Sequence, residues 1–350
     1  MQQQKLDIIN TDSDLYCDTN VNKKFTFIDL FAGIGGFHQA LKELGGECVA
    51  ACENNDNARK TYLSNHEVPA EHFYEDINDL DVCNLPDHDF LCAGFPCQPF
   101  SISGKQRALN DKRSNVIESL FNIIKVKKPK IVMLENVKHI KHINKGEVFN
   151  YVIESLEKLG YKVSFELLNA RNFGVAQNRE RWLFIGVLNK EKYNFKYEKT
   201  ETVLLKDVID KIGNFSYLNE PFTLIDEPKK QPSGLMFCGY RNKKIRINGV
   251  REGTEHLSRV HKQPNRIYSI DGVHPTIPSQ ESSGRFWILL EDGRVRKLTV
   301  AECFRIMGFN DGFVKPVSDG NLYKQIGNSV CVPMVKIISK SLLKHMNYLS

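Results

Sequence analysis

One cysteine stands between two prolines directly after an apolar stretch. Cys97 lies between Pro96 and Pro99, and the apolar run at 89–93 comes just before this segment. Because proline restricts the backbone on both sides, the thiol is presented in a fixed direction, as a nucleophile requires. Catalysis would also need nearby positive charge to populate the thiolate. An isolated cysteine is more often a small buried hydrophobe, and we assign that role to the other eight of the nine cysteines.

Three further charged side chains flank predicted strands. Glu135 follows the apolar run at 130–134, which places its carboxyl at the same sheet edge as Cys97. There it could donate a proton to an electron-poor ring. Arg179 and Arg181 precede the run at 182–187, and guanidinium groups can bind an exocyclic carbonyl or neutralise a phosphate. Taken alone, the two arginines also fit a surface charge cluster.

A glycine-rich turn follows the first apolar run. Gly33 and Gly35 lie in segment 29–36, where the missing side chains let the backbone approach a ligand. The spacing is not the full dinucleotide fingerprint, and a tight strand-to-helix connection would also explain it. Glu53 ends the next predicted strand and could accept hydrogen bonds from both ribose hydroxyls, while Asp76 could hold an adenine amino group. Each carboxylate alone could be a solvated residue or a helix cap, but together with the turn they favour a nucleotide-like cofactor.

Apolar runs and helical patterns alternate along the first half of the chain. We expect strands at 25–31, 47–52, 89–93, 130–134, 162–168 and 182–187, and helices between them, notably at 115–126 and 147–159. The last segment, 323–348, returns to helical apolar spacing. Alternation of this kind implies crossover connections. The expected fold class is therefore α/β, with a doubly wound, mostly parallel sheet covered on both faces and a second, smaller domain.

The composition limits the classes of partner and compartment. The net charge of +6 favours a polyanionic partner without requiring one. The cysteines lack the spacing of a zinc site or a disulfide framework, so we expect no metal and a cytoplasmic protein. No run approaches the roughly 18 apolar residues of a spanning helix, so we expect no membrane role.

Together these motifs resemble the DNA (cytosine-5)-methyltransferase family of the bacterial restriction-modification type. The glycine turn, Glu53, Asp76, the Pro96-Cys97 pair, the Glu135 motif and the 177–181 block occur in that family's order. Segments 296–309 and 325–330 are similar to its last two motifs. The resemblance extends from about Phe25 to the C-terminus, and several motifs in one order are far more specific than any single match.

The resemblance implies a base-flipping enzyme that uses S-adenosylmethionine and releases S-adenosylhomocysteine. Cys97 would add to the 6-position of cytosine, so that the 5-position takes the methyl group. Glu135 would engage ring nitrogen 3 and the amino group, Arg181 the 2-carbonyl, and Arg179 would support the catalytic loop and the thiolate. The family's cofactor-binding positions fall on Phe31, Gly33, Gly35, Glu53, Asp76, Ile77, Pro96, Asn328 and Ser329.

The same resemblance divides the chain and implies its partners. We expect a poorly ordered leader at 1–24, a catalytic domain at 25–195 completed by 327–350, a target-recognition domain at 196–299 and a connecting hinge at 300–326. The partner would be double-stranded DNA, with nucleoid association when bound, and a cognate restriction endonuclease could act on the same site. We expect a monomer. The implied DNA contacts are Gln98, Ser101, Lys105, Arg107, Arg241 and Thr276.

Basic side chains interleaved with aromatic or histidine side chains mark the recognition region. Phosphate contacts and groove reading both need such chemistry, although a solvated basic face would explain many of the same positions. The basic residues are Lys229, Lys230, Arg241, Lys243, Lys244, Arg246, Arg251, Arg259, Lys262 and Arg266, and the interleaved ones are Tyr240, His256 and Tyr268.

Two residues depart from the family pattern. Asn54 stands where an aromatic usually stacks on the adenine, which would lower cofactor affinity, and Ser114 stands where glycine is common, which would alter closure of the catalytic loop.

Three other functions compete with this prediction. A transfer-RNA cytosine-5 methyltransferase shares the motifs, but a basic region of about a hundred residues favours duplex DNA. A catalytically silent DNA-binding regulator is disfavoured by the intact Cys97, Glu135 and Arg181. A nicotinamide dehydrogenase shares only the glycine turn.

Overall fold

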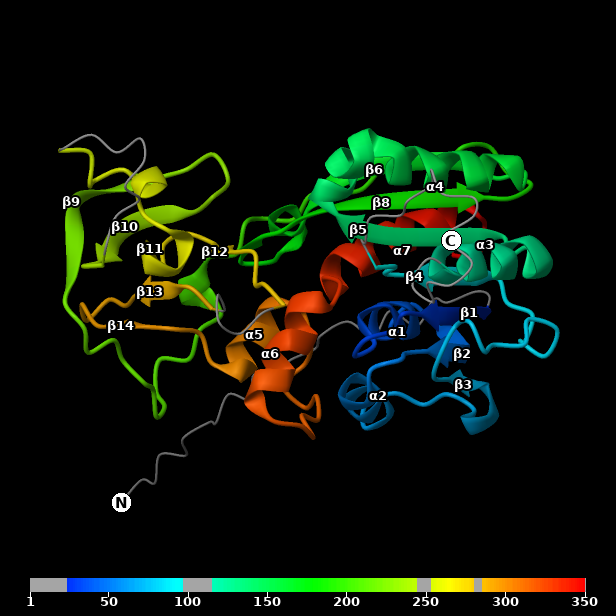
Figure 1. The fold of residues 1–350 in the computed structure, drawn as a ribbon, viewed down its shortest axis with the longest axis horizontal. Helices are drawn as coiled ribbons and strands as arrows, with labels where there is room; N and C mark the ends of the chain where they lie inside the picture. The colour runs from blue at the N-terminus through cyan, green and yellow to red at the C-terminus, as the bar shows by residue number, and fades with distance from the viewer. Residues whose placement is uncertain (1–23, 97–114, 244–252, 280–284, 350) are drawn as a thin grey trace, which may run out of the picture.

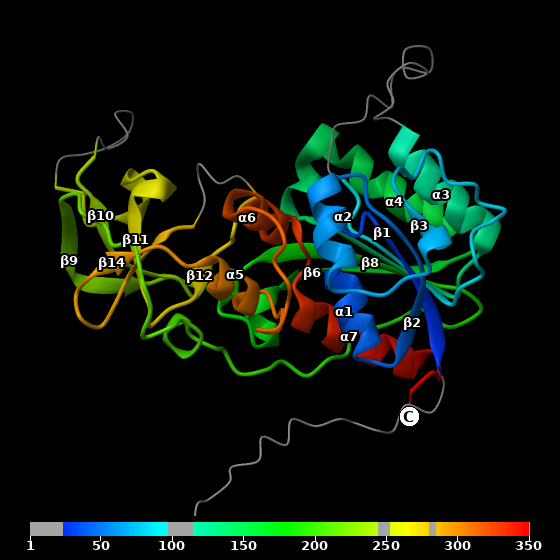
Figure 2. The same cartoon turned by 90° about the horizontal axis from the view of Figure 1, so that it is seen from below.

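The computed structural model describes residues 24–96, 115–243, 253–279 and 285–349. The predicted leader at 1–24 therefore lies outside the described residues except for Lys24. Two lobes lie side by side, each built around its own sheet, and helices α5 and α6 lie between them (Figures 1 and 2).

The larger lobe contains a seven-stranded sheet in the order β3-β2-β1-β4-β5-β8-β6. Strands β1 to β5 pair in parallel, and β8 runs antiparallel to both β5 and β6. The prediction of a doubly wound, mostly parallel sheet is thus confirmed. The strands are β1 (Phe25–Leu30), β2 (Gly46–Cys52), β3 (Phe73–Tyr74), β4 (Phe90–Ala93), β5 (Ile131–Val137), β6 (Lys162–Asn169) and β8 (Glu180–Val187).

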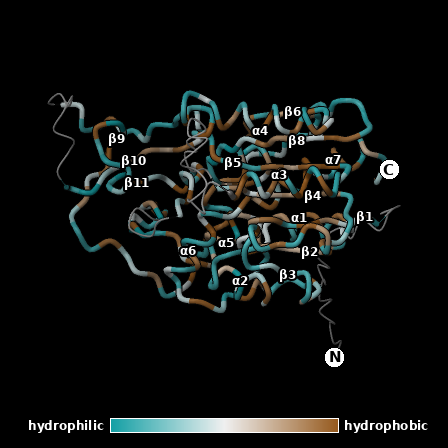
Figure 3. Tube along the Cα trace, turned by 45° about the vertical axis from the view of Figure 1, so that its right-hand side comes forward, coloured by the Kyte–Doolittle hydropathy of each residue, from teal (hydrophilic) through white to brown (hydrophobic). Residues whose placement is uncertain are grey.

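Helices that each bury one side against the strands cover both faces of this sheet. Figure 3 shows apolar stretches along the central strands, as expected for parallel strands buried on both faces. The helices of this lobe are α1 (Gly36–Lys42), α2 (Asp56–Leu63), α3 (Asn115–Lys127), α4 (Glu147–Lys158) and α7 (Val332–His345).

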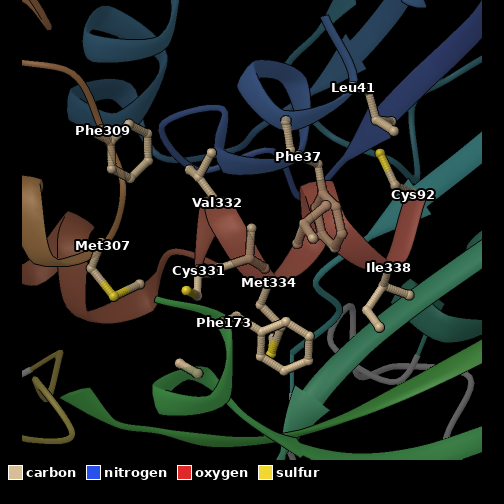
Figure 4. Packing of buried hydrophobic residues seen from close by; sticks show 14 of the residues in the cluster. Phe37, Leu41, Cys92, Phe173, Met307, Phe309, Cys331, Val332, Met334 and Ile338 are labelled. Carbon is tan, nitrogen blue, oxygen red and sulfur yellow. The ribbon is translucent and has the colours of Figure 1, made fainter. Parts of the chain in front are cut away.

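The C-terminal segment is two helices where the sequence suggested one continuous helical stretch. Helix α6 (Asp319–Asn328) and α7 are separated by residues 329–331, and Pro333 opens α7. Figure 4 shows α7 placing Met334 and Ile338 among Phe37 and Phe173. Segment 319–345 is apolar enough for a membrane span by composition, yet 67% of its most apolar window is buried inside the protein.

The smaller lobe contains a five-stranded sheet that the sequence did not reveal. Its order is β14-β13-β11-β10-β9, with only β11 and β13 paired in parallel. All five strands fall between residues 222 and 296. They are β9 (Phe222–Lys230), β10 (Met236–Arg241), β11 (Arg266–Ser269), β13 (Trp287–Leu289) and β14 (Val295–Arg296).

Two connections join the lobes. The short strands β7 (Gln177–Asn178) and β12 (His274–Pro275) pair in parallel. Thr299 caps the N-terminus of helix α5 (Val300–Ile306). Glu302 completes the capping box and forms a buried ion pair of 2.7 Å with Arg296. Because both charges are buried and paired, removing either one would leave an uncompensated charge.

Candidate active site

The strand order reverses between β1 and β4, which places two predicted motifs side by side. From β1 the chain continues to β2 on one side, while β4 pairs with β1 on the other. The glycine turn follows β1, and residues 94–96, which lead to Cys97, follow β4. Ligands of open α/β sheets bind at such a switch point.

The glycine turn is held in a left-handed conformation. Phe31, Gly33 and Gly35 have φ of 56°, 56° and 83°. The Gly33 amide donates to Glu53 Oε2 at 2.7 Å, and the Asn55 amide donates to Glu53 Oε1 at 2.8 Å. A carboxylate can accept further bonds on its remaining lone pairs. Glu53 is therefore held beside the turn, and its carboxylate oxygens can still accept hydrogen bonds from a ligand.

A cavity opens at this turn. It encloses about 150 Å³. Among its lining residues are four of special interest: Phe31, Glu53, Asp76 and Ile77, all predicted to bind the cofactor. Exposed Asn54 also lines it, at the position where the family usually has an aromatic ring.

His66 contacts the backbone of the glycine turn, a contact that was not predicted from the sequence. Its Nε2 lies 3.1 Å from the Ile34 carbonyl oxygen, and its ring stacks on His38 at 4.4 Å. Burial lowers the pKa of His66 to about 4, so the ring is neutral at pH 7 and Nε2 can carry the proton that it donates to the carbonyl. His66 lies in a loop outside every predicted motif, which is why the pattern missed it.

If the glycine turn binds S-adenosylmethionine, as the resemblance in sequence implies, alanine at position 35 is expected to weaken that binding by about tenfold or more. A Cβ there would lie 2.2 Å from His66 Nε2, and the left-handed backbone costs an L-residue about 1–2 kcal/mol. Gly293→Ala is a matched control, because Gly293 has φ of 80° with no atom within 4 Å of an added Cβ. Calorimetry with S-adenosylhomocysteine measures both variants. Equal affinities for the two would contradict this role of the turn.

The C-terminal segment closes against the same turn. A Cβ on Gly36 would lie 2.9 Å from Ser329 Oγ and 2.7 Å from Val330 Cγ2. Ser329 is buried, whereas Asn328, the last residue of α6, is exposed. The break between α6 and α7 thus brings Ser329, one of the two predicted tail residues, into contact with the turn.

Glu135 and Arg181 form a buried pair at the carboxyl end of β5. Glu135 Oε1 lies 3.0 Å from Arg181 Nε, yet no hydrogen bond to Oε1 is aligned among the described residues. Burial raises the pKa of Glu135, and the charges of Arg181 and Arg179 oppose this shift. Burial also lowers the pKa of Arg181. The carboxyl therefore keeps its proton to higher pH than an exposed glutamic acid does, and it offers an oxygen to a ligand.

The neighbouring Asn136 ties this pair to the segment that leads to Cys97. Its Nδ2 donates to the Phe95 carbonyl at 3.0 Å. A Cβ on Gly94 would lie 3.9 Å from Glu135 Oε2. Asn136 was assigned no role of its own from the sequence, although a polar residue just after a predicted apolar strand was a usable signal. Cys97, Gln98, Ser101, Lys105, Arg107 and Ser114 lie outside the described residues, and Pro96 is exposed beside them.

Arg179 forms hydrogen bonds with backbone carbonyls near the Glu135–Arg181 pair. Its guanidinium donates to the carbonyls of Ile277, Gly327 and Ser329 at 3.3, 3.0 and 2.6 Å. Burial, and then the charge of Arg181, lower its pKa to about 9, so it remains charged at pH 7. Arg179 thereby holds the smaller lobe and the C-terminal segment against the site.

Other predicted DNA contacts have protein partners. Arg241 forms an ion pair of 2.5 Å with Glu220, which offsets part of its charge. Thr276 donates its hydroxyl proton to the Asn178 carbonyl at 2.6 Å. Tyr240 stacks on His261 at 3.9 Å. Tyr268 is fully buried, so its predicted place among groove-reading residues is wrong: its ring packs in the core of the smaller lobe.

Among the described residues, six cysteines are buried and one is exposed. Cys48, Cys52, Cys92, Cys238, Cys303 and Cys331 are buried, as predicted, but Cys83 is exposed and that assignment is wrong. Cys331 lies near Arg179 and Arg181, and burial raises the pKa of its thiol to about 11. Within the described ranges, no three His, Cys, Asp or Glu side chains are placed to hold a metal ion.

Comparison with known proteins identifies the family. Residues 25–344 match the family described as C-5 cytosine-specific DNA methylase. The chain is 34% identical to Type II methyltransferase M.NlaX of Neisseria lactamica over 91% of this chain and 96% of that one. It is 34% identical to Type II methyltransferase M.HhaI of Haemophilus parahaemolyticus, over 92% and 95%.

Solved structures show the same fold at lower identity. The S. pombe Dnmt2 methyltransferase superposes with a TM-score of 0.70 at 19% identity, over 92% of this chain and 99% of that one. The Entamoeba histolytica methyltransferase EhMeth gives 0.67 at 18% identity, over 93% and 99%. The resemblance inferred from the motifs is confirmed: this chain belongs to the C-5 cytosine-specific DNA methylase family and is a DNA cytosine-5 methyltransferase.

Proposed function

We propose that this enzyme methylates a flipped-out cytosine within a specific duplex DNA sequence, with Cys97 as the covalent nucleophile. The observation that carries this proposal is the buried Glu135–Arg181 pair at 3.0 Å, beside the segment that leads to Cys97. Position 97 is next to Pro96, and Glu135 lies 3.9 Å from the position of a Cβ on Gly94. A nucleophile, a carboxyl whose pKa is raised by burial and a guanidinium would then surround one base.

We propose S-adenosylmethionine as the cofactor that binds at the glycine turn, which is supported by the residues that line the cavity there. Its ribose hydroxyls match Glu53, whose oxygens are fixed by two amides, and Asp76 and Ile77 line the part where an adenine would lie. Gly33, Gly35, Phe31 and Pro96 would border the rest, with Asn328 and Ser329 closing it. When bound, this cofactor supplies a methyl group on a positively charged sulfur. Because Asn54 stands in place of an aromatic, no ring at position 54 adds stacking on the adenine to the affinity.

Each catalytic side chain would then act on a defined atom of the cytosine. The thiolate of Cys97 adds to carbon 6, and the electron pair of the 5,6 double bond moves to carbon 5. Glu135 holds a proton at ring nitrogen 3, and Arg181 donates to the 2-carbonyl oxygen, so both stabilise the charge that develops on the ring. After carbon 5 has used this electron pair to take the methyl group, loss of the carbon 5 proton to solvent and departure of the Cys97 thiolate restore the 5,6 double bond. Arg179 acts as a positioning residue through its three carbonyl contacts.

The smaller lobe, within the predicted recognition region 196–299, would read the DNA sequence. Lys229 and Lys230 at the end of β9 are exposed, as is Lys243. We further propose a monomer in the cytoplasm, associated with the nucleoid when bound to DNA. As a partner we propose a cognate restriction endonuclease that acts on the same site, in line with the similarity of this chain to proteins named type II methyltransferases.

Transfer of a labelled methyl group tests the substrate. One enzyme preparation is incubated with tritiated S-adenosylmethionine and either duplex DNA or transfer RNA. We expect label in DNA only. Label confined to transfer RNA would contradict the choice of DNA, and no label in either nucleic acid would indicate a silent DNA-binding regulator.

A further inference from the structure

A basic turn directly follows the strand that carries Glu135. The exposed side chains of Lys138, His139, Lys141, His142 and Lys145 lie in the 3₁₀ turn Lys138–Gly146, and we call these five residues the basic turn. The segment contains no acidic residue. None of the family motifs identified in the sequence includes this turn.

Packing against the sheet fixes the position of the turn. Ile140 is fully buried. The Trp182 indole N–H donates to the Lys138 carbonyl at 3.2 Å. The Lys141 ammonium lies 5.2 Å from the Trp182 ring centroid and 5.7 Å from that of Phe149. A cation held over two rings needs little further ordering when it meets an anion.

Most of the positive charge of the turn is not neutralised within the protein. Lys138 forms an ion pair of 2.8 Å with Glu180, and 55% of its side chain remains exposed. For Lys141 and Lys145, no ion pair exists among the residues that the structure describes. An uncompensated, single-signed cluster of this kind favours a polyanion.

The turn lies at the edge of the sheet where the base would enter. Val137, the residue before it, is paired with Arg181 on β8, and β7 just before β8 pairs with β12 of the smaller lobe. Lys138 is three residues beyond Glu135, about 10 Å along an extended strand. A base bonded to Glu135 brings its own sugar and phosphates to this edge.

We propose that the basic turn binds backbone phosphates of the duplex next to the flipped cytosine, which rests on the function proposed above. Lys138, Lys141 and Lys145 are phosphate ligands that add affinity without reading sequence. They are distinct from the recognition lobe, and they anchor the strand whose base leaves the stack. Each phosphate neutralised releases condensed counterions, so the contacts are visible as a dependence of affinity on salt.

A charge-removing triple variant tests this proposal. The variant combines Lys138→Gln, Lys141→Gln and Lys145→Gln. Its affinity for a fluorescent duplex is measured from about 50 to about 200 mM KCl, the range of salt concentration over which protein–DNA affinity changes steeply. We expect about tenfold or more loss of affinity and a salt slope smaller in magnitude by about 2–3, since each phosphate contributes about 0.9. S-adenosylhomocysteine binding should be unchanged, which also reports folding.

Two further triple variants test whether the salt dependence comes from the positive charge of the basic turn or from any loss of positive charge in the protein. Lys125, Lys128 and Lys162 are exposed and lie before β5 and at the start of β6, on the opposite edge of the sheet. Their replacement by Gln should leave the slope near that of the unmodified enzyme. Replacement of the three turn lysines by Arg should also preserve it, because the charge remains.

Different results overturn different claims. Equal slopes for the turn triple and the opposite-edge triple would overturn the proposed phosphate contacts. A loss of affinity for transfer RNA of similar length without any loss for duplex DNA would overturn the choice of DNA at this turn. If the unmodified enzyme methylates no DNA, the proposed function fails instead, and the labelled methyl transfer shows this separately.

Discussion

Replacing Cys97 with serine is expected to reduce methyl transfer to DNA by about a thousandfold or more, with cofactor affinity unchanged. A serine hydroxyl does not ionise near neutral pH and is a weaker nucleophile than a thiolate, so addition to carbon 6 becomes rate-limiting. The initial rate of labelled methyl transfer measures the loss. Calorimetry with S-adenosylhomocysteine measures the cofactor affinity.

Cys83→Ser is the matched control for this variant. Cys83 is exposed, and no hydrogen bond, ion pair or ring contact of its side chain is found among the described residues. The same change of sulfur to oxygen should there leave the rate of methyl transfer as it was. Undiminished turnover of the Cys97 variant would remove the proposed mechanism.

Glu135→Gln is expected to lower kcat by about a hundredfold to ten-thousandfold, the range typical of removing a general acid. The amide has nearly the same shape and keeps contact with the segment at Gly94, but it has no proton to give to ring nitrogen 3. Single-turnover methyl transfer measures the effect without interference from product release. An unchanged single-turnover rate would show that Glu135 does not act on the base.

The pH profile distinguishes proton donation by Glu135 from a purely structural role. Burial raises its pKa, so the protonated carboxyl persists to higher pH than an exposed glutamic acid would allow. Activity that needs this proton is present below the raised pKa and declines as pH rises through it. We expect the decline attributable to Glu135 to be absent in Glu135→Gln. The same decline in both proteins would assign it to another group.

The larger lobe could be predicted because its strands are buried on both faces. Strands such as β4 and β5 are nearly continuous apolar runs, which stand out from the amphipathic helices between them. Turns at their carboxyl ends could then be assigned to one edge of the sheet. The short strand β3 was missed because two residues carry no period.

The smaller lobe could not be predicted in the same way. In β9 most side chains are half-buried or exposed, and β13 and β14 have only three and two residues. Short strands with mostly exposed side chains have the same sequence pattern as a loop. The sequence therefore indicated a separate lobe but did not predict its sheet. Its stability depends on contacts distant in sequence, such as the pairing of Ile267 with Trp287.

The site was predicted at the level of residue types but not of contacts. Strand ends identified Glu53, Glu135 and Arg181, because chemistry at a sheet edge needs polar residues there. That Arg179 binds three carbonyls from distant segments depends on how the lobes meet. The support of Ile34 by His66 likewise arises from tertiary packing, which local sequence does not encode.

Covalent trapping tests the central claim most directly. The enzyme is mixed with S-adenosylmethionine and a duplex in which 5-fluorocytosine replaces the target cytosine, so that no proton can leave carbon 5 after methylation. We predict a denaturation-resistant protein–DNA adduct whose peptide map places the bond on Cys97, and no adduct with Cys97→Ser. A duplex that is methylated without any adduct, or an adduct that persists in the serine variant, would contradict the account.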